Sequence, residues 1–148
     1  VGPYDDEKLG FYKVVKFYYY PGWGEGGTAN HMLINLTKWN ELPKGYQSIL
    51  EAAAAACNVK QLADYDAKNP QALKRLVANG VQLRPFTQSV LEACLKASNE
   101  VNAETSAINA DYKKTWDSIA AFRNDEYLWW QVAEYTYDSF MIRSRPRS

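Results

Sequence analysis

The sequence predicts an α/β fold that is mostly helical, and three observations lead to this prediction. β-Branched and aromatic residues fill positions 14–20, as is typical of a strand in a buried sheet. From Lys44 onward, apolar residues recur at three- and four-residue spacing, which is the pattern of helices with one packed face. The segment from Asn109 to Arg145 keeps this spacing without a proline or glycine, so helices should outweigh strands.

Length and charge narrow the class of protein. The 148 residues suffice for one domain or a large part of one, and a hydrophobic content of 47% can fill a core. Lys and Arg total 17 and balance 17 Asp and Glu, so the sequence lacks the basic excess typical of nucleic-acid binding. No apolar run reaches the roughly 18 residues of a membrane span. Because no signal-peptide pattern follows Val1, we expect that a leader or an upstream portion has been removed.

Turn residues divide the first third of the chain into short elements. Residues 2–10 have the composition of a loop with a short turn of helix before the strand at 14–20. The apolar run 31–36 is bounded by turn residues and predicts a second buried strand. Residues 37–42 can form one helical turn. Pro43 then suits the start of the next helix, because its missing N–H would be unpaired there.

The middle of the chain predicts two helices and a strand. The first helix should run from Lys44 to about residue 67 with one packed face. Asn69 and Pro70 have the chemistry of a cap and a first-turn proline, so they predict a second helix, which Gly80 ends. Residues 81–85 are too few for a helix and predict an edge strand or an extended link.

Thr87 is expected to cap a further helix. Cys57 and Cys94 occupy apolar positions of helical segments, and their spacing matches no metal or redox motif. They are therefore predicted to be small buried side chains, while their redox state stays open.

The final segment predicts an unusually long helix. A helix from 110 to 142 would be about 50 Å long, whereas a compact domain of this size has a radius of gyration near ~15 Å. Its aromatic residues would aggregate if left in water. Three alternatives stay open: the helix crosses another domain of the same chain, it docks onto a second copy, or it breaks near Asn124 and folds back.

The segment 18–27 is the main candidate for a binding site. Pro21 ends the strand, and four glycines then permit a tight loop that a ligand can approach closely. Trp23 offers an apolar face, and Glu25 offers a hard oxygen ligand for a cation. The alternative is an ordinary turn with an aromatic lid on the core.

The residues of a catalytic site do not stand out, so we predict that the protein is not an enzyme. His31 is the single histidine, and no serine or cysteine nucleophile motif accompanies it. The glycines at 22, 24 and 27 match a phosphate loop in spacing, but an apolar run follows instead of a helix start, and Glu25 would repel phosphate. Glu51 is a weaker candidate site residue, which a solvated helix surface explains.

Several motifs together resemble one family. The loop reads Tyr-Tyr-Tyr-Pro-Gly-Trp-Gly-Glu-Gly-Gly at 18–27, and Asn-Leu-Thr-Lys-Trp-Asn-Glu-Leu-Pro follows at 35–43. Leu-Arg-Pro-Phe occupies 83–86. In this combination the chain resembles the DctP-type extracytoplasmic solute receptors of TRAP (tripartite ATP-independent periplasmic) transporters. With the opening residues 1–10 and the closing aromatic helix, it is most similar to the branch that binds α-keto acids.

The resemblance implies the C-terminal part of a two-lobed periplasmic binding protein. Residues 1–108 would form part of an α/β lobe with the ligand loop at 20–27. Residues 109–148 would form a long helix that joins lobes or pairs two copies into a homodimer. Partners would be a small carboxylate such as an α-keto acid and the membrane subunits of the TRAP permease. The alternative function is a helical dimerisation module that binds no ligand.

The resemblance also assigns the site. Trp23 and Glu25 would contact the substrate, and the Gly24 carbonyl with Glu25 would hold Na⁺ or Ca²⁺, both of which prefer oxygen ligands. No true cofactor is implied. Gly24 stands where a bulky residue is expected in relatives, so a side-chain wall of the pocket is lost. The arginine that anchors the substrate carboxylate in the family belongs to the first half of such receptors, which this chain does not match.

Overall fold

The computed structural model describes residues 2–24, 27 and 30–146. The chain divides into two compact units, Val1–Gln88 and Ser89–Ser148. Within the described residues, no helix has both the length and the apolar character that crossing a membrane requires.

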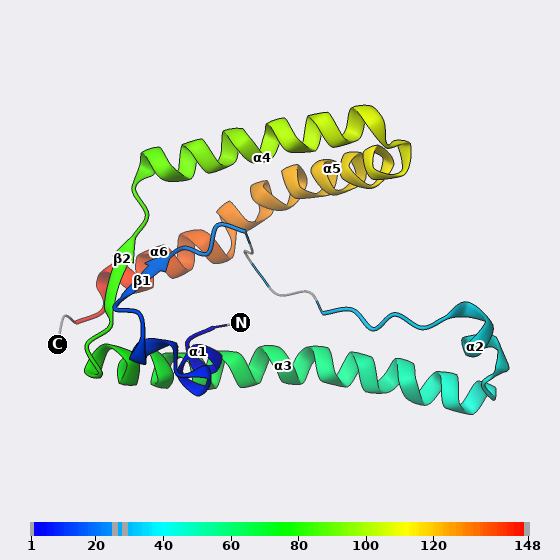
Figure 1. The fold of residues 1–148 in the computed structure, drawn as a ribbon, viewed down its shortest axis with the longest axis horizontal. Coiled ribbons are helices and arrows are strands. Elements are labelled where there is room, and N and C mark those ends of the chain that lie inside the picture. Colours follow the sequence, from blue (N-terminus) through cyan, green and yellow to red (C-terminus); the bar gives the residue numbers. More distant parts are fainter. Residues whose placement is uncertain (1, 25–26, 28–29, 147–148) are drawn as a thin grey trace. The chain divides into compact units, whose positions relative to one another are not determined.

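The first unit is built on one long helix and a small parallel sheet (Figure 1). Its elements are α1 Pro3–Leu9, the 3₁₀ helix η1 Phe11–Lys13, β1 Phe17–Tyr20, α2 Leu36–Glu41, α3 Lys44–Ala78 and β2 Gln82–Pro85. The strands pair in parallel, with Phe17 opposite Gln82 and Tyr20 opposite Pro85. Their carboxyl ends therefore lie at the same edge of the sheet.

Polar contacts fasten α1 to the C-terminal half of α3. The Arg75 guanidinium donates to both carboxylate oxygens of Glu7, with Nε 2.6 Å from Oε1 and Nη2 2.7 Å from Oε2. On the preceding turns of α3, the Tyr65 hydroxyl donates to Asp5 Oδ2 at 2.6 Å. These contacts join residues that are far apart in the sequence, so α1 is a fixed part of the first unit.

Few side chains of the described residues are fully buried. Ala72, Leu76 and Val81 form the buried apolar group where α3 turns into β2. Gln47 is also buried, and its Nε2 donates to the backbone oxygens of Trp39 and Leu42, at 2.7 and 3.3 Å, which ties α2 to the start of α3. Most large apolar side chains lie exposed, so this chain leaves more apolar surface in water than a complete domain does.

Two predicted strands differ in outcome. The first is confirmed but shorter: the N–H groups of Val14 and Val15 donate to the Phe11 carbonyl in a turn, and β1 begins only at Phe17. The second strand, predicted at 31–36, is wrong. Residues 31–35 form no β-strand, and α2 begins at Leu36. Leu33 is 94% exposed, so this segment is not buried either. Its apolar pattern suits a strand, but within the described chain it has no neighbouring strand to pair with.

The two helices predicted at 44–67 and after Asn69 are one helix. α3 starts directly after Pro43 as expected and continues through Pro70 to Ala78. Gly80 follows its end with a φ of 90°, in the left-handed region that favours glycine. The predicted stop is therefore confirmed, whereas the predicted break is wrong.

The second unit holds three helices, namely α4 Gln88–Ile108, α5 Ala110–Val132 and α6 Glu134–Ser144. At the α4–α5 junction, Asn109 Oδ1 accepts the backbone N–H of Tyr112 at 2.9 Å. The Tyr112 hydroxyl donates to Asn102 Oδ1 at 2.6 Å and so joins the start of α5 to the end of α4, where the chain reverses direction (Figure 1).

The predicted unbroken helix from 110 to 142 is corrected by a break at Ala133. Its φ of −89° and ψ of −102° lie outside the helical region. The Thr136 hydroxyl donates to the Gln131 carbonyl and so gives this backbone oxygen near the break a hydrogen-bond donor. α5 passes through Asn124 without interruption, so the alternative in which the chain folds back there is also wrong.

Candidate functional site

The candidate ligand loop starts where β1 ends. Tyr20 is the last residue of β1, and the bond to Pro21 is cis. Just past the end of β2, the Phe86 N–H donates to the Tyr20 carbonyl at 2.8 Å. Ligands of open α/β sheets bind at the carboxyl ends of parallel strands, which is the edge where residues 21–24 lie.

Two of the three predicted site residues are described by the structure. Trp23 is 39% exposed, so part of its indole ring is available to a ligand. A side chain at Gly24 would meet no heavy atom within 4 Å, which leaves the backbone there open to close approach. Glu25 lies outside the described residues. The segment 21–24 thus offers an apolar face and an accessible backbone.

A cation site built only from side chains is not found in the described part of the chain. No group of three or more His, Cys, Asp or Glu residues that could hold a metal ion occurs there. The accessible backbone at Gly24 nevertheless fits a hard cation, since Na⁺ and Ca²⁺ accept carbonyl oxygen. The described donors account for only part of a coordination shell.

An aromatic pair that sequence reasoning missed lies beside the loop. The rings of Tyr19 and Phe86 stack with their centroids 5.1 Å apart and their planes 24° apart. Phe86 is half-buried and ends the Leu-Arg-Pro-Phe motif, which the sequence associates with the family and not with the site. The signal that could have found it is its place directly after the strand that pairs with β1.

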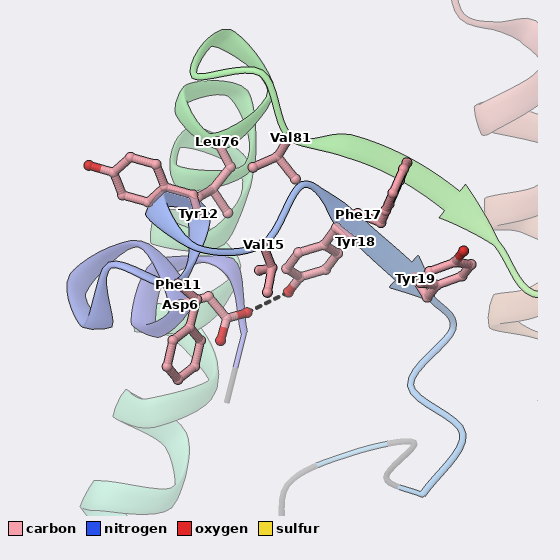
Figure 2. Close-up of a pocket in the computed structure, with 9 residues that line it drawn as sticks. All are labelled: Asp6, Phe11, Tyr12, Val15, Phe17, Tyr18, Tyr19, Leu76 and Val81. Carbon is pink, nitrogen blue, oxygen red and sulfur yellow. Dashed lines mark hydrogen bonds between the residues drawn. The ribbon is translucent and has the colours of Figure 1, made fainter.

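A separate cavity of about 220 Å³ lies between the start of β1, α1 and α3 (Figure 2). Its lining is mainly aromatic and aliphatic, and its residues are Asp6, Phe11, Tyr12, Val15, Phe17, Tyr18, Tyr19, Leu76 and Val81. None of these described lining residues is basic, so they cannot balance the charge of a bound carboxylate. This cavity is a poor candidate for the anion site.

A polar contact in this cavity joins β1 to α1. The Tyr18 hydroxyl donates to Asp6 Oδ2 at 2.7 Å (Figure 2). Desolvation, followed by this hydrogen bond and the Asp6 charge, raises the pKa of Tyr18 well above its usual value. The Tyr18 hydroxyl therefore stays protonated further into alkali, and its hydrogen bond joins the strand that leads to the ligand loop to α1.

The remaining candidates from the sequence lie apart from the loop. Glu51 is exposed on α3, in accord with a solvated helix surface. His31 is exposed in the segment 31–35, which forms no strand. Cys57 is an exposed free thiol and Cys94 a half-buried one, so the prediction that both are buried is wrong.

Known proteins support the same interpretation of the chain. A curated relative, the monocarboxylate 2-oxoacid-binding periplasmic protein of Nostoc sp. (strain PCC 7120), is 43% identical over 145 residues, which are 98% of this chain and 40% of the relative. A TRAP transporter solute-binding protein from Bordetella bronchiseptica RB50 is 39% identical with a TM-score of 0.89, over 97% of this chain and 43% of that one. Its structure is a mixed-occupancy dimer, with calcium and picolinate in one active site and the other apo.

A second solved structure is the TRAP periplasmic solute-binding protein of Pseudoalteromonas atlantica T6c with bound sodium and pyruvate. It is 29% identical with a TM-score of 0.82, over 99% of this chain and 44% of that one. The chain thus spans less than half the length of these relatives. The sequence model of the bacterial extracellular solute-binding proteins, family 7, matches residues 1–108. The chain therefore belongs to the bacterial extracellular solute-binding proteins of family 7.

Proposed function

We propose that this chain is part of a TRAP-transporter receptor that binds a small 2-oxo carboxylate together with Na⁺ or Ca²⁺. The observation that carries the proposal is the place of the loop 21–24, open and partly apolar, at the carboxyl edge of two parallel strands. The ligands of the relatives, pyruvate with sodium and picolinate with calcium, are likewise small carboxylates accompanied by a cation.

Each site residue has a stated role in this proposal. The Trp23 ring packs on the apolar part of the ligand. The Gly24 carbonyl and the Glu25 carboxylate supply oxygen ligands to the cation, which in turn attracts the carboxylate of the ligand. The remaining contacts come from the part of a full-length receptor that this chain does not span. Binding alters no covalent bond of the ligand, so the function is transport and not catalysis.

The same proposal assigns a location and partners. The Nostoc relative is a periplasmic protein, and we assign this chain to the periplasm as well. The receptor would deliver its ligand to the membrane subunits of a TRAP permease.

We also propose that the second unit pairs with the same unit of another copy. α5 and α6 expose large apolar side chains along their length, among them Trp129, Trp130, Val132, Tyr135, Tyr137 and Phe140. So many exposed aromatics favour a partner surface. A dimerisation module without ligand binding would use the same helices, and it is the competing function.

Calorimetric titration tests the binding function. Pyruvate is titrated into a full-length receptor that carries this chain, first after removal of cations and then with added Na⁺ or Ca²⁺. We expect binding that requires one of the cations. Absence of heat with pyruvate and with related 2-oxo acids, under both conditions, would overturn the proposal and leave the dimerisation module.

A further inference from the structure

The ends of β1 and β2 are joined by two contacts that lie directly before the candidate ligand loop. The Phe86 N–H donates to the Tyr20 carbonyl at 2.8 Å, one residue before Pro21. The Phe86 ring stacks on Tyr19 with centroids 5.1 Å apart. Pro21 has no N–H to donate, and a side chain at Gly24 would meet no heavy atom within 4 Å, so neither of these two described residues adds a contact of this kind.

We infer that Phe86 is a positioning residue that holds the loop 21–24 through its stack on Tyr19. The inference rests on the proposed function insofar as the loop binds the ligand. Phe86 itself is not assigned a contact with the ligand. Its ring holds the end of β1, and the end of β1 determines the position of the segment that carries Trp23 and Gly24.

The size of the effect follows from the contact. A stacked aromatic pair contributes enough that its loss corresponds to an about threefold to tenfold change in an equilibrium. If loss of the stack shifts the equilibrium between the held and the released loop by that factor, the amide exchange of the loop and its ligand affinity should both change by a similar factor. If Phe86 supported only the sheet, its substitution would change neither the amide exchange of the loop nor the ligand affinity more than a matched control does.

The chain offers such a control on the same strand. Phe17 and Tyr19 are both 52% exposed and lie on the same face of β1, since side chains alternate along a strand. Phe17 lies two residues farther from the loop than Tyr19 does. The Phe17 ring has its own contact with β2, since Arg84 Cζ lies 5.7 Å from its centroid. Phe17→Leu therefore removes a different ring contact between the two strands without touching the stack, and Phe86→Tyr keeps a ring at position 86.

The experiment combines hydrogen exchange and titration on a full-length receptor that carries this chain. We expect Phe86→Leu and Tyr19→Leu to speed exchange in the peptide that contains residues 22–24, and to weaken pyruvate binding by about threefold to tenfold. Phe17→Leu and Phe86→Tyr should behave like the unchanged protein. The double variant should lose no more than either single variant, because both remove the same contact.

Two results would count against the inference, and a third separates it from the proposed function. Exchange in Phe86→Leu that matches Phe17→Leu would overturn the inference. Faster exchange with unchanged affinity would overturn the role of Phe86 in binding. If the unchanged receptor binds no carboxylate, the proposed function fails, and faster exchange in Phe86→Leu alone would still support the hold on the loop.

Discussion

Asn69, within α3, caps the first helix of the chain through a hydrogen bond to Tyr4. Its Oδ1 accepts the Tyr4 N–H at 3.0 Å. The residue at the N-cap position of α1 is Gly2, which has no side chain to serve as the acceptor. A Cβ at Gly2 would lie 2.9 Å from Asn69 Nδ2, so the glycine makes room for a cap that comes from another helix.

Removing this cap should destabilise the first unit. We expect Asn69→Ala to lower the free energy of unfolding by about 1 kcal/mol relative to Asn99→Ala, since N-caps contribute that much. Asn99 is an exposed asparagine within α4, so its replacement gives the same gain in helix propensity without the loss of the cap. Urea unfolding measures both variants. Equal stability of the two would contradict the assignment of Asn69 as the cap.

The same residue explains why one prediction from the sequence is wrong. Asn69 and Pro70 have the chemistry of a helix start, and a proline inside a helix costs one backbone hydrogen bond. In the structure the Asn69 side chain turns to α1, and α3 continues through Pro70 to Ala78. Which partner a capping side chain takes depends on the residues packed beside it, and local sequence does not contain that information.

Features that depend on local chemistry can be predicted from the sequence. These include the start of α3 after Pro43, its end before Gly80 and the strand at 82–85. Features that depend on a neighbour cannot. The segment 31–36 has strand composition but no strand beside it in the described chain, and the break at Ala133 carries no proline or glycine.

In the candidate site, too, local features can be predicted from the sequence and contacts between distant residues cannot. The loop and its open backbone at Gly24 follow from the glycines after a strand. The stack of Phe86 on Tyr19 does not, because it needs the parallel register of two strands that are far apart in the sequence. Glu25 stays a prediction, since it lies outside the described residues.

The ion pair between Glu7 and Arg75 should make stability depend on acid pH. The hydrogen bond from Arg75 lowers the pKa of Glu7 below its usual 4.5. A lowered pKa contributes stability that is present above 4.5 and is lost as the pH falls through the folded-state value. We expect Glu7→Gln to be less stable than the unchanged protein at neutral pH and equal to it in acid.

Urea unfolding at a series of pH values measures this difference. Glu41→Gln is the control, because Glu41 forms an exposed ion pair with Lys38 within α2, and such pairs contribute little. A stability difference for Glu7→Gln that does not change between neutral and acid pH would contradict the role of the ionised carboxylate.

Tyr18 should produce the opposite dependence in alkali. Its pKa is raised by desolvation and by the hydrogen bond to Asp6. The resulting stability is fully present below pH 10.0, the usual pKa, and is lost as the pH rises through the folded-state value. Tyr18→Phe should therefore be less stable at neutral pH, and its difference from the unchanged protein should shrink above pH 10.0. Urea unfolding with Tyr46→Phe as an exposed control measures it, and a constant difference would contradict the role of the Tyr18 hydroxyl.

The break at Ala133 permits a sharp test of the proposed dimer. Ending the chain after Ala133 removes α6 with its exposed Tyr135, Tyr137 and Phe140, while α5 stays whole. We expect this variant to sediment as a monomer and a control that ends after Ser144 to sediment as a dimer. If both forms have the same oligomeric state, α6 does not hold the copies together.

Titration of two carboxylate variants tests the binding site most directly. Pyruvate is titrated into full-length receptors that carry Glu25→Gln or Glu51→Gln, with Na⁺ or Ca²⁺ either present or removed. Glu51 is the exposed carboxylate on α3 and serves as the control. We predict that Glu25→Gln weakens pyruvate binding by about tenfold or more and abolishes its dependence on the cation, while Glu51→Gln binds like the unchanged receptor. Cation-dependent binding of equal affinity in both variants would contradict the proposed site.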